Sequence, residues 1–298
     1  MKNVESARGF WAAVAVTAIT PIVWGTTYYT TTQLLPDNRP LLAGTLRALP
    51  AGLLLAALAR RRPRGSWWWK STVLGVLNIG AFFPLLFVAA YRLPGGVAAA
   101  VGAIQPLVAA ALAAVLLGER FSAVNLLTGL MGIVGVTLLV LRNQVPLDAI
   151  GVVAALGGAL SMASGVVLTK KWQRPVPLLA FTSWQLVAGG LVILPVMLVV
   201  EGLPTELTPR NIAGFSWLSL IGCALAYSLW FRGIGKLPVA ATSVLALIAP
   251  VVAAVIGFLA LGQTLTALQL VGVVVILLSV AITQWWACLL YTSDAADE

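Results

Sequence analysis

Few residues of this sequence have the chemistry that catalysis needs. The 298 residues include no histidine and only two cysteines, Cys223 and Cys288. The usual His/Cys metal sites and histidine-dependent acid–base or triad mechanisms therefore cannot be built. The acidic residues fall near the ends of apolar stretches, in the loops between them or in the terminal segments. We predict no catalytic residue, no metal and no cofactor, and we expect that the protein is not an enzyme.

Aromatic and amide side chains inside apolar stretches are better suited to binding a substrate. Polar groups in such places are costly and usually functional. The candidate substrate-binding residues are Trp24, Tyr28, Arg47, Asn78, Phe82, Gln105, Tyr227 and Trp230. An aromatic cavity with a few amide and hydroxyl groups suits a flat, moderately polar molecule. The alternative is structural: each aromatic packs between helices, and each amide bonds a neighbouring helix.

Two charged residues need a separate interpretation. Arg47 is the only charged residue placed inside an apolar stretch, about 10 Å deep at 1.5 Å per residue. It either reaches outward to the interface or to helix-end carbonyls, or it faces a central cavity and anchors an anion. Glu119 sits at a helix end, where an interfacial cap or an ion pair with Arg120 is the structural reading.

The composition indicates that lipid, and not water, surrounds most of the chain. Hydrophobic residues make up 60% and charged residues 9%, with a mean hydropathy of +1.01. A soluble domain carries about 25% charged residues. A helix needs about 20 apolar residues to cross a bilayer. We predict an all-α membrane protein with ten transmembrane helices, at 10–33, 40–59, 69–91, 95–117, 123–141, 148–169, 177–200, 211–231, 237–261 and 265–286.

The net charge of +9 is explained by topology better than by nucleic acid, which we do not expect as a partner. With the N-terminus in the cytoplasm, 13 basic residues lie on the cytoplasmic side, four lie opposite and Arg47 lies within a span. We therefore predict a multi-pass protein of the bacterial inner membrane with both termini cytoplasmic. The basic cluster at 60–64 is either part of this topology signal or a contact for anionic lipid.

An internal repeat divides the ten predicted helices. At an offset of 144 residues, 93–129 and 237–273 share 11 identities in 37 positions without a gap. Pro106 matches Pro250 in this alignment, and each removes one backbone donor near the middle of its helix. We predict two five-helix repeats, 1–145 and 146–286, which must be inverted because five is odd. The two prolines are the predicted conformational hinges, unless their kinks serve packing alone.

Several motifs resemble one transporter family. They are Trp24-Gly25-Thr26, the stretch from Tyr91-Arg92-Leu93-Pro94 through Pro106 to Gly118-Glu119-Arg120, and its second-half counterpart from Leu237-Pro238 to Leu261-Gly262-Gln263. These residues resemble the ten-helix EamA family of the drug/metabolite transporter superfamily. The stretches 46–50, 158–162 and 181–185 look closest to its subgroup named for a blue-pigment (indigoidine) exporter.

The resemblance implies export of a small metabolite or toxic compound by alternating access. The cavity would then be formed by the first, third and fourth helices and their counterparts. An exporter of aromatic or cysteine-type amino acids is the alternative within the class. A membrane-embedded enzyme or a channel is disfavoured, because clustered catalytic groups and a filter motif or charged ring are absent from the sequence. The expected partners are a small-molecule substrate and membrane lipids, with the protein as a monomer or homodimer.

Two features of the sequence concern packing and the C-terminus. Gly129, Gly132 and Gly135 are spaced for close helix contact, within the chain or in a dimer. The tail 287–298 holds three of the nine acids and has no basic residue, unlike the C-terminal ends of the family. We expect this tail not to be native sequence and assign it no function.

Overall fold

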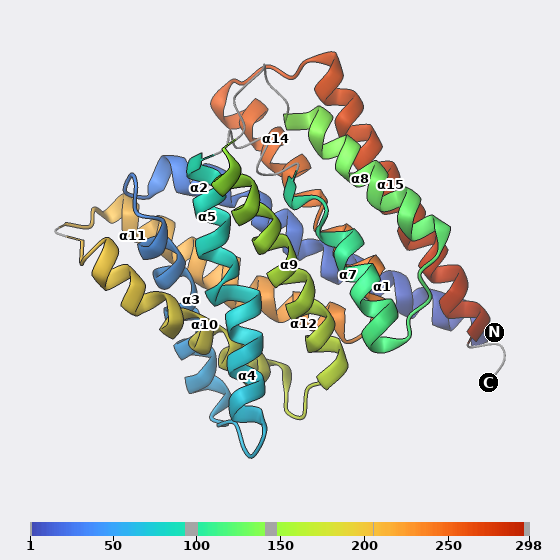
Figure 1. Cartoon of the computed structure of the whole chain (residues 1–298), viewed down its shortest axis with the longest axis horizontal. Helices are drawn as coiled ribbons and strands as arrows, with labels where there is room; N and C mark the ends of the chain where they lie inside the picture. The colour runs from blue at the N-terminus through green and yellow to red at the C-terminus, as the bar shows by residue number, and fades with distance from the viewer. Residues whose placement is uncertain (1, 93–100, 141–147, 205, 295–298) are drawn as a thin grey trace.

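The computed structural model of the chain is a bundle of helices, and it describes residues 2–92, 101–140, 148–204 and 206–294 (Figure 1). The helical elements are α1 Lys2–Gly25, α2 Thr27–Leu34, α3 Pro40–Ala59, α4 Trp67–Gly75, η1 Val76–Gly80, α5 Phe82–Arg92, α7 Gln105–Leu117, α8 Ala123–Val140, α9 Ala149–Trp172, α10 Leu178–Val200, α11 Pro209–Ser216, η2 Trp217–Leu225, α12 Ala226–Ile234, α13 Val239–Leu245, α14 Ile248–Leu261 and α15 Ala267–Asp294. Helices satisfy their backbone groups internally, which lipid requires of a spanning segment.

The predicted all-α membrane fold is confirmed. Within the described ranges, nine helical segments are long and apolar enough to cross a bilayer. The remaining predicted span, the fourth at 95–117, is described only from residue 101, where α7 supplies a shorter apolar helix. Its first residues, with the matched Leu93-Pro94 pair, lie outside the described part of the chain.

Several predicted spans are interrupted and are not single α-helices. The first span breaks at Thr26, between α1 and α2. The third and eighth contain the π-helical segments η1 and η2. The fourth and ninth break into turns at 103–104 and 246–247, where backbone bonds join residues three apart.

The breaks in the fourth and ninth spans lie just before the two prolines predicted as hinges. Pro106 is therefore the second residue of α7, and Pro250 is the third residue of α14. At these positions a missing backbone N–H costs little, because the first residues of a helix have no intrahelical acceptor. The structure thus has a helix restart where the sequence predicted a kink.

Elements separated by 144 residues have the same local structure in both halves of the chain. Adding 144 to the residue numbers of η1 gives 220–224, which lies inside η2. In the same way, α5 corresponds to α12, α7 to α14 and α8 to α15. The matched residues Gly118 and Gly262 both end their helices with a positive φ, 71° and 63°. Their cap bonds, to the carbonyls of Ala113 and Gly257, are also related by the same offset. The repeat boundary at 145/146 stays a prediction.

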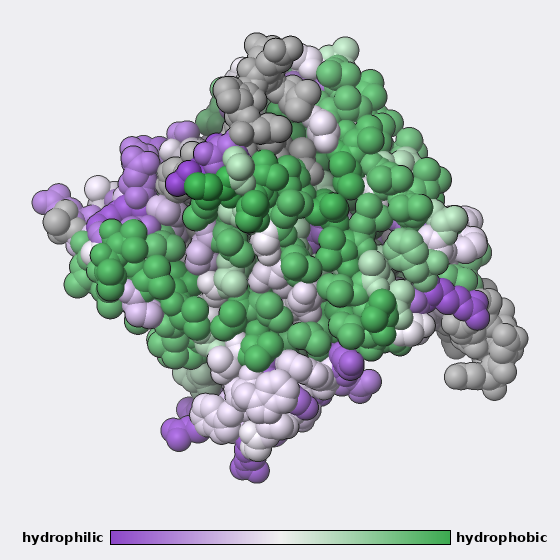
Figure 2. Space-filling view, viewed as in Figure 1, coloured by the Kyte–Doolittle hydropathy of each residue, from purple (hydrophilic) through white to green (hydrophobic). Residues whose placement is uncertain are grey.

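The bundle has two chemically different ends. One end carries most of the basic side chains, and we call it the basic end. Contacts between neighbouring residues join its members, which are the 60–64 cluster, Lys70, Glu119, Lys170 and Lys236. At the opposite end, the Glu201 carboxylate accepts the backbone N–H groups of Leu41 and Leu42 at the start of α3. Figure 2 shows an apolar belt between polar patches on the visible face, as a membrane-spanning bundle requires.

Helices α8 and α15 lie side by side along one edge of the bundle (Figure 1). The three predicted contact glycines of α8 all serve packing within the chain. Gly129 faces Leu107, Gly132 faces Leu247, and Gly135 lies against the backbone of Gly272 and against Ile276. These contacts support the packing interpretation for these glycines.

The last helix continues beyond the predicted end of the tenth span. We expected that span to end at 286, but α15 runs to Asp294. No glycine or proline follows Gly272 to stop the helix. The ring of Tyr291 lies 5.8 Å from that of Phe10 at the start of α1. Whether the tail is native sequence stays a prediction.

The α8–α15 contact predicts the effect of a single methyl group. In Gly272→Ala, the new Cβ would lie 2.6 Å from the Leu139 nitrogen and 2.7 Å from the Gly135 oxygen, so the backbones must separate. We expect a loss of about 1–3 kcal/mol in the free energy of unfolding, measured by thermal unfolding in detergent. Gly157→Ala is the matched control, because its Cβ meets Leu85 at an ordinary 3.5 Å. Equal stability of both variants would contradict this packing.

Candidate binding site

Three of the predicted aromatic residues form one cluster between α1 and α12. The Trp24 ring lies 5.1 Å from the Tyr227 ring and 5.2 Å from the Trp230 ring. Tyr227 and Trp230 are buried, whereas Trp24 is half-buried. These separations are typical of favourable aromatic contacts. The structure therefore brings together aromatics that are about 200 residues apart in the chain, and their role in substrate binding stays a prediction.

The cluster is anchored on the two π-helical segments. The Trp24 indole N–H donates to the Gly222 carbonyl in η2 at 3.1 Å. The Tyr227 hydroxyl donates to the Asn78 carbonyl in η1 at 3.4 Å. Asn78 and Gly222 are matched positions at the 144-residue offset. Each half of the chain thus donates one aromatic hydrogen bond to the equivalent carbonyl of the other half.

A buried amide pair lies next to this cluster. The Asn78 side-chain amide donates to the Gln185 side-chain oxygen at 2.8 Å and to the Thr169 hydroxyl at 3.4 Å. The Asn78 side chain packs against Gly165, where a Cβ would overlap its amide. Asn78 Oδ1 and Gln185 Nε2 are buried without a partner. Buried polar atoms without a partner are rare in folded proteins, so these two call for an explanation, which a functional role can supply.

Arg47 lies inside the bundle rather than at its surface. Its side chain does not reach outward to the interface or to helix-end carbonyls. Its Nε donates to the Cys223 sulfur at 3.3 Å, and its guanidinium carbon lies 4.9 Å from the Phe83 ring centre. Arg47 is 8% exposed. This location agrees with the interior alternative of the sequence analysis.

The π-helical turn changes which phenylalanine faces the site. We predicted Phe82, four residues after Asn78, from α-helical spacing. The bond from the Ala81 nitrogen to the Val76 carbonyl spans five residues and inserts an extra residue into this turn. Phe83 is buried against Arg47, whereas Phe82 is half-buried near Gly158.

Gln105 lines a separate cavity of about 530 Å³ between α7, α8, α14 and α15. Its described lining includes Tyr29, Pro250 and Gln263, but it includes none of the aromatic cluster. The amide nitrogen of Gln105 is buried without a partner. The helix breaks before Pro106 and Pro250 border this cavity, which extends toward the opposite end at Gln263. The side chain of Tyr28 lies outside the described part of the structure.

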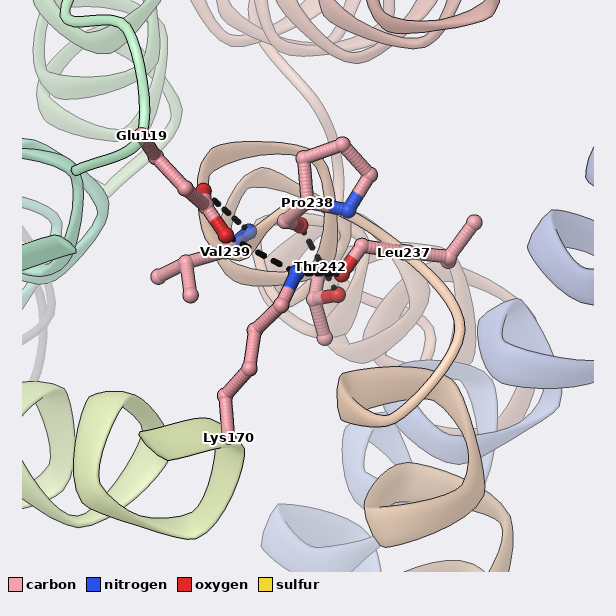
Figure 3. A network of polar contacts seen from close by, with 6 residues as sticks. All are labelled: Glu119, Lys170, Leu237, Pro238, Val239 and Thr242. Atoms are coloured by element: carbon pink, nitrogen blue, oxygen red, sulfur yellow. Dashed lines mark hydrogen bonds and ion pairs between the residues drawn. The ribbon is translucent and has the colours of Figure 1, made fainter. Parts of the chain in front are cut away.

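An ionic network joins three parts of the chain at the basic end (Figure 3). The Glu119 carboxylate pairs with Lys170 at 2.8 Å and accepts the Val239 backbone N–H at 2.9 Å. The Lys170 ammonium also donates to the Leu237 carbonyl at 2.6 Å. The sequence reading of an ion pair with Arg120 is wrong, because the αL cap at Gly118 turns the chain toward α9 and α13. The residue that matches Glu119 at the opposite end is Gln263, which carries no charge.

A second hollow at the basic end is lined by arginine and tryptophan. Its volume is about 870 Å³. The Trp184 indole N–H donates to the Arg61 carbonyl at 2.9 Å, and Lys70 lies 5.3 Å from the Trp67 ring centre. Its lining residues are Arg60, Arg61, Arg62, Pro63, Arg64, Trp67, Trp68, Pro175, Val176 and Trp184. Basic and aromatic residues at a membrane boundary suit lipid headgroups.

Comparison with known proteins decides the family. The EamA-like transporter family matches residues 11–141 and 149–285. The chain belongs to the EamA-like transporter family. It is similar to Protein PecM of Dickeya dadantii, with 48% identity over 89% of both chains. The predicted membership of the drug/metabolite transporter superfamily is confirmed.

More distant relatives of this EamA-like transporter agree with a membrane transport function. An uncharacterized inner membrane transporter of Escherichia coli K12, YedA, is 25% identical over 88% of this chain and 87% of its own. A solved crystal structure superposes with a TM-score of 0.79 over 93% of this chain and 97% of that one, at 21% identity. This structural likeness shows the fold alone.

Some residues of the site escaped the sequence analysis. Gln185 and Thr169 lie in predicted spans, and Gln185 is the last residue of 181–185, one of the stretches that carried the family resemblance. An amide in the middle of a long apolar run was the available signal. Cys223 and Phe83 gave no such signal, because their roles depend on the two π-helical segments.

The network at the basic end of this EamA-like transporter predicts a local change in backbone exchange. In Glu119→Ala, the Val239 amide loses its acceptor and Lys170 loses its partner. We expect exchange in peptides from 237–245 to accelerate about tenfold, for a lost hydrogen bond of about 1.4 kcal/mol. Hydrogen–deuterium exchange with mass spectrometry measures this rate. Glu206→Ala is the control, because Glu206 is an exposed acid in the 201–208 loop. Unchanged exchange in the Glu119 variant would refute this role.

Proposed function

We propose that this EamA-like chain is a secondary transporter of the bacterial inner membrane that exports a small, flat, moderately polar metabolite or toxic compound by alternating access. The observation that carries the proposal is the reciprocal pair of aromatic hydrogen bonds between the two π-helical segments. It creates an aromatic site at the junction of the two halves of the chain. Transporters with inverted repeats bind substrate at such a junction, near the bilayer midplane.

The chemistry of this junction favours a planar substrate. The rings of Trp24, Tyr227 and Trp230 supply apolar surface in a fixed arrangement. Unpartnered buried atoms of Trp230, Asn78 and Gln185 would supply one indole donor, one amide acceptor and one amide donor once a conformational change exposes them. A few fixed polar groups in an aromatic pocket orient a ligand and give specificity.

The contrast between the two ends supports alternating access. The Glu119–Lys170 network ties the chain after α7 to α9 at the basic end, while the cavity lined by Gln105 extends toward the opposite end. The helix breaks beside Pro106 and Pro250 are suitable points for flexing, since two short helices can reorient where one continuous helix cannot. The transport cycle would break the Glu119 network to open the basic end.

The distribution of basic residues supports the proposed orientation. Basic side chains are concentrated at the end that holds the 60–64 cluster, and the positive-inside rule assigns that end to the cytoplasm. The N-terminal part of α1 lies at this end, because Phe10 packs in one cluster with Leu237 and its ring contacts Tyr291 of α15. The name of the relative YedA refers to an inner membrane transporter, in agreement with this location.

An amino-acid exporter is the second candidate within the transporter class. The specific observation in its favour is the contact of Arg47 with Phe83, which could hold a carboxylate beside an aromatic side chain.

Among the described residues, no group of His, Cys, Asp or Glu could hold a metal ion. No observation favours a membrane-embedded enzyme or a channel.

Counterflow in liposomes tests the transport function. An overexpression screen for resistance to planar dyes and heteroaromatic metabolites selects the compound to load, and the purified full-length chain is then reconstituted. We expect uptake of labelled compound that depends on unlabelled compound inside and that saturates. Flux that rises linearly with concentration would indicate a channel and contradict the proposal.

Substitutions of Trp24 test the site itself. Trp24→Ala removes the ring that contacts Tyr227 and Trp230, and we expect counterflow to fall at least about tenfold. Trp24→Phe keeps a ring and loses only the bond to Gly222, so it should fall less. Trp285→Ala is the control, because Trp285 is 64% exposed on α15. Wild-type counterflow in Trp24→Ala at equal expression would contradict the assignment of the aromatic cluster as the substrate site.

A further inference from the structure

Arg47 is a charged residue at a depth where charge is expensive. It lies within α3, whose 20 residues form one of the spanning segments, and it is 8% exposed. The guanidinium cannot lose its proton in a protein, so the positive charge remains in the interior. An intramembrane charge of this kind needs a partner, and it usually marks a substrate or ion pathway.

The described residues around Arg47 do not neutralise it. Its partners are the Cys223 sulfur, a weak acceptor, and the face of Phe83. The only ion pairs of the described chain are Arg92–Asp148 and Lys170–Glu119, and both lie at the ends of the bundle. Only one of the five N–H groups of Arg47 therefore donates a hydrogen bond to a described residue, and its acceptor is a neutral sulfur.

The terminal nitrogens of Arg47 also remain open to a ligand. They donate to no described protein atom, and they are absent from the set of sealed, unpartnered polar atoms, so they border accessible space. Ser219 precedes Cys223 by four residues on η2, is buried, and its hydroxyl has no partner. Arg47 thus carries unused, accessible donors where α3 meets η2, whereas the Ser219 hydroxyl on η2 is unpartnered and sealed.

We propose that Arg47 is the receptor for the anionic group of the transported molecule, which is therefore a planar organic anion. This inference rests on the proposed transport function and defines its substrate class. The aromatic cluster of Trp24, Tyr227 and Trp230 holds the rings, and the planar guanidinium pairs with a carboxylate or an equivalent oxyanion. Binding supplies the counter-charge that the protein lacks.

The same contacts select against amino acids. The ammonium group of a zwitterionic amino acid would need an acidic or carbonyl-rich partner near Arg47. The acids of the described spans lie at the helix ends, as Glu119, Asp148 and Glu201 do. An anion without an ammonium group therefore fits the site better than the amino-acid alternative does.

Equilibrium binding tests this proposal independently of transport. The full-length chain in lipid nanodiscs is titrated with indole-3-acetate and indole-3-acetamide, and with benzoate and benzamide, while the midpoint of thermal unfolding is recorded. Each pair has the same ring and differs in charge. We expect wild-type protein to bind the anion of at least one pair at least about tenfold more tightly than its amide. Absence of this preference in both pairs would overturn the proposal.

Variants then assign the preference to Arg47. Arg47→Gln should bind anion and amide equally, whereas Cys223→Ala should retain the preference because the charge remains. Arg232→Gln, which removes one positive charge from the last turn of α12, is the matched control and should also retain the preference. A preference that survives in Arg47→Gln would contradict the assignment. If that variant does not fold, Arg47→Lys decides, and the preference must fall at least about threefold because lysine lacks the bidentate fork.

The outcomes separate this inference from the proposed function. Saturable counterflow without an anion preference would leave the transporter in place and exclude the anion receptor. An anion preference without counterflow would keep the receptor and remove the transport assignment.

Discussion

Backbone carbonyl groups in lipid must find a donor, and this constraint shapes the centre of the molecule. The π-helical segments η1 and η2 interrupt the regular ladder, and side chains from distant helices occupy their carbonyls. Ser161 donates to Leu77 at 2.8 Å and Tyr227 to Asn78 at 3.4 Å in η1, while Trp24 donates to Gly222 at 3.1 Å in η2. The irregular backbone therefore holds together residues from both halves of the chain.

The position of these bonds would couple the proposed substrate binding to conformational change. η1 and η2 run in opposite directions, because α4 starts at the basic end and α11 starts at the opposite end, where Asn211 donates to the Leu34 carbonyl at 2.9 Å. A molecule between their aromatic partners touches both halves at once. Any relative movement of the halves changes the surroundings of that molecule, which alternating access requires.

The sequence predicted the helices and singled out the residues of the aromatic cluster, because both steps depend on local signals. Long apolar runs gave the spans, the place of Trp24 near the middle of its span gave that residue, and helical spacing within the eighth span gave Tyr227 and Trp230. The π-helical turns had no sequence signal, so Phe82 was chosen where Phe83 faces Arg47. The partner of Glu119 was also missed, since Lys170 is 51 residues away and only tertiary packing brings them together. Gln105 was grouped with the aromatic residues for the same reason, because only tertiary packing shows that it lines a separate cavity.

A crystal structure with a brominated analogue of the counterflow substrate tests the central claim most directly. Anomalous scattering from bromine locates the ligand without relying on the shape of the density. The account predicts a peak between Trp24 and Tyr227, with the anionic group of the analogue directed at Arg47. A peak between Gln105 and Pro250, in the cavity between α7, α8, α14 and α15, would contradict it.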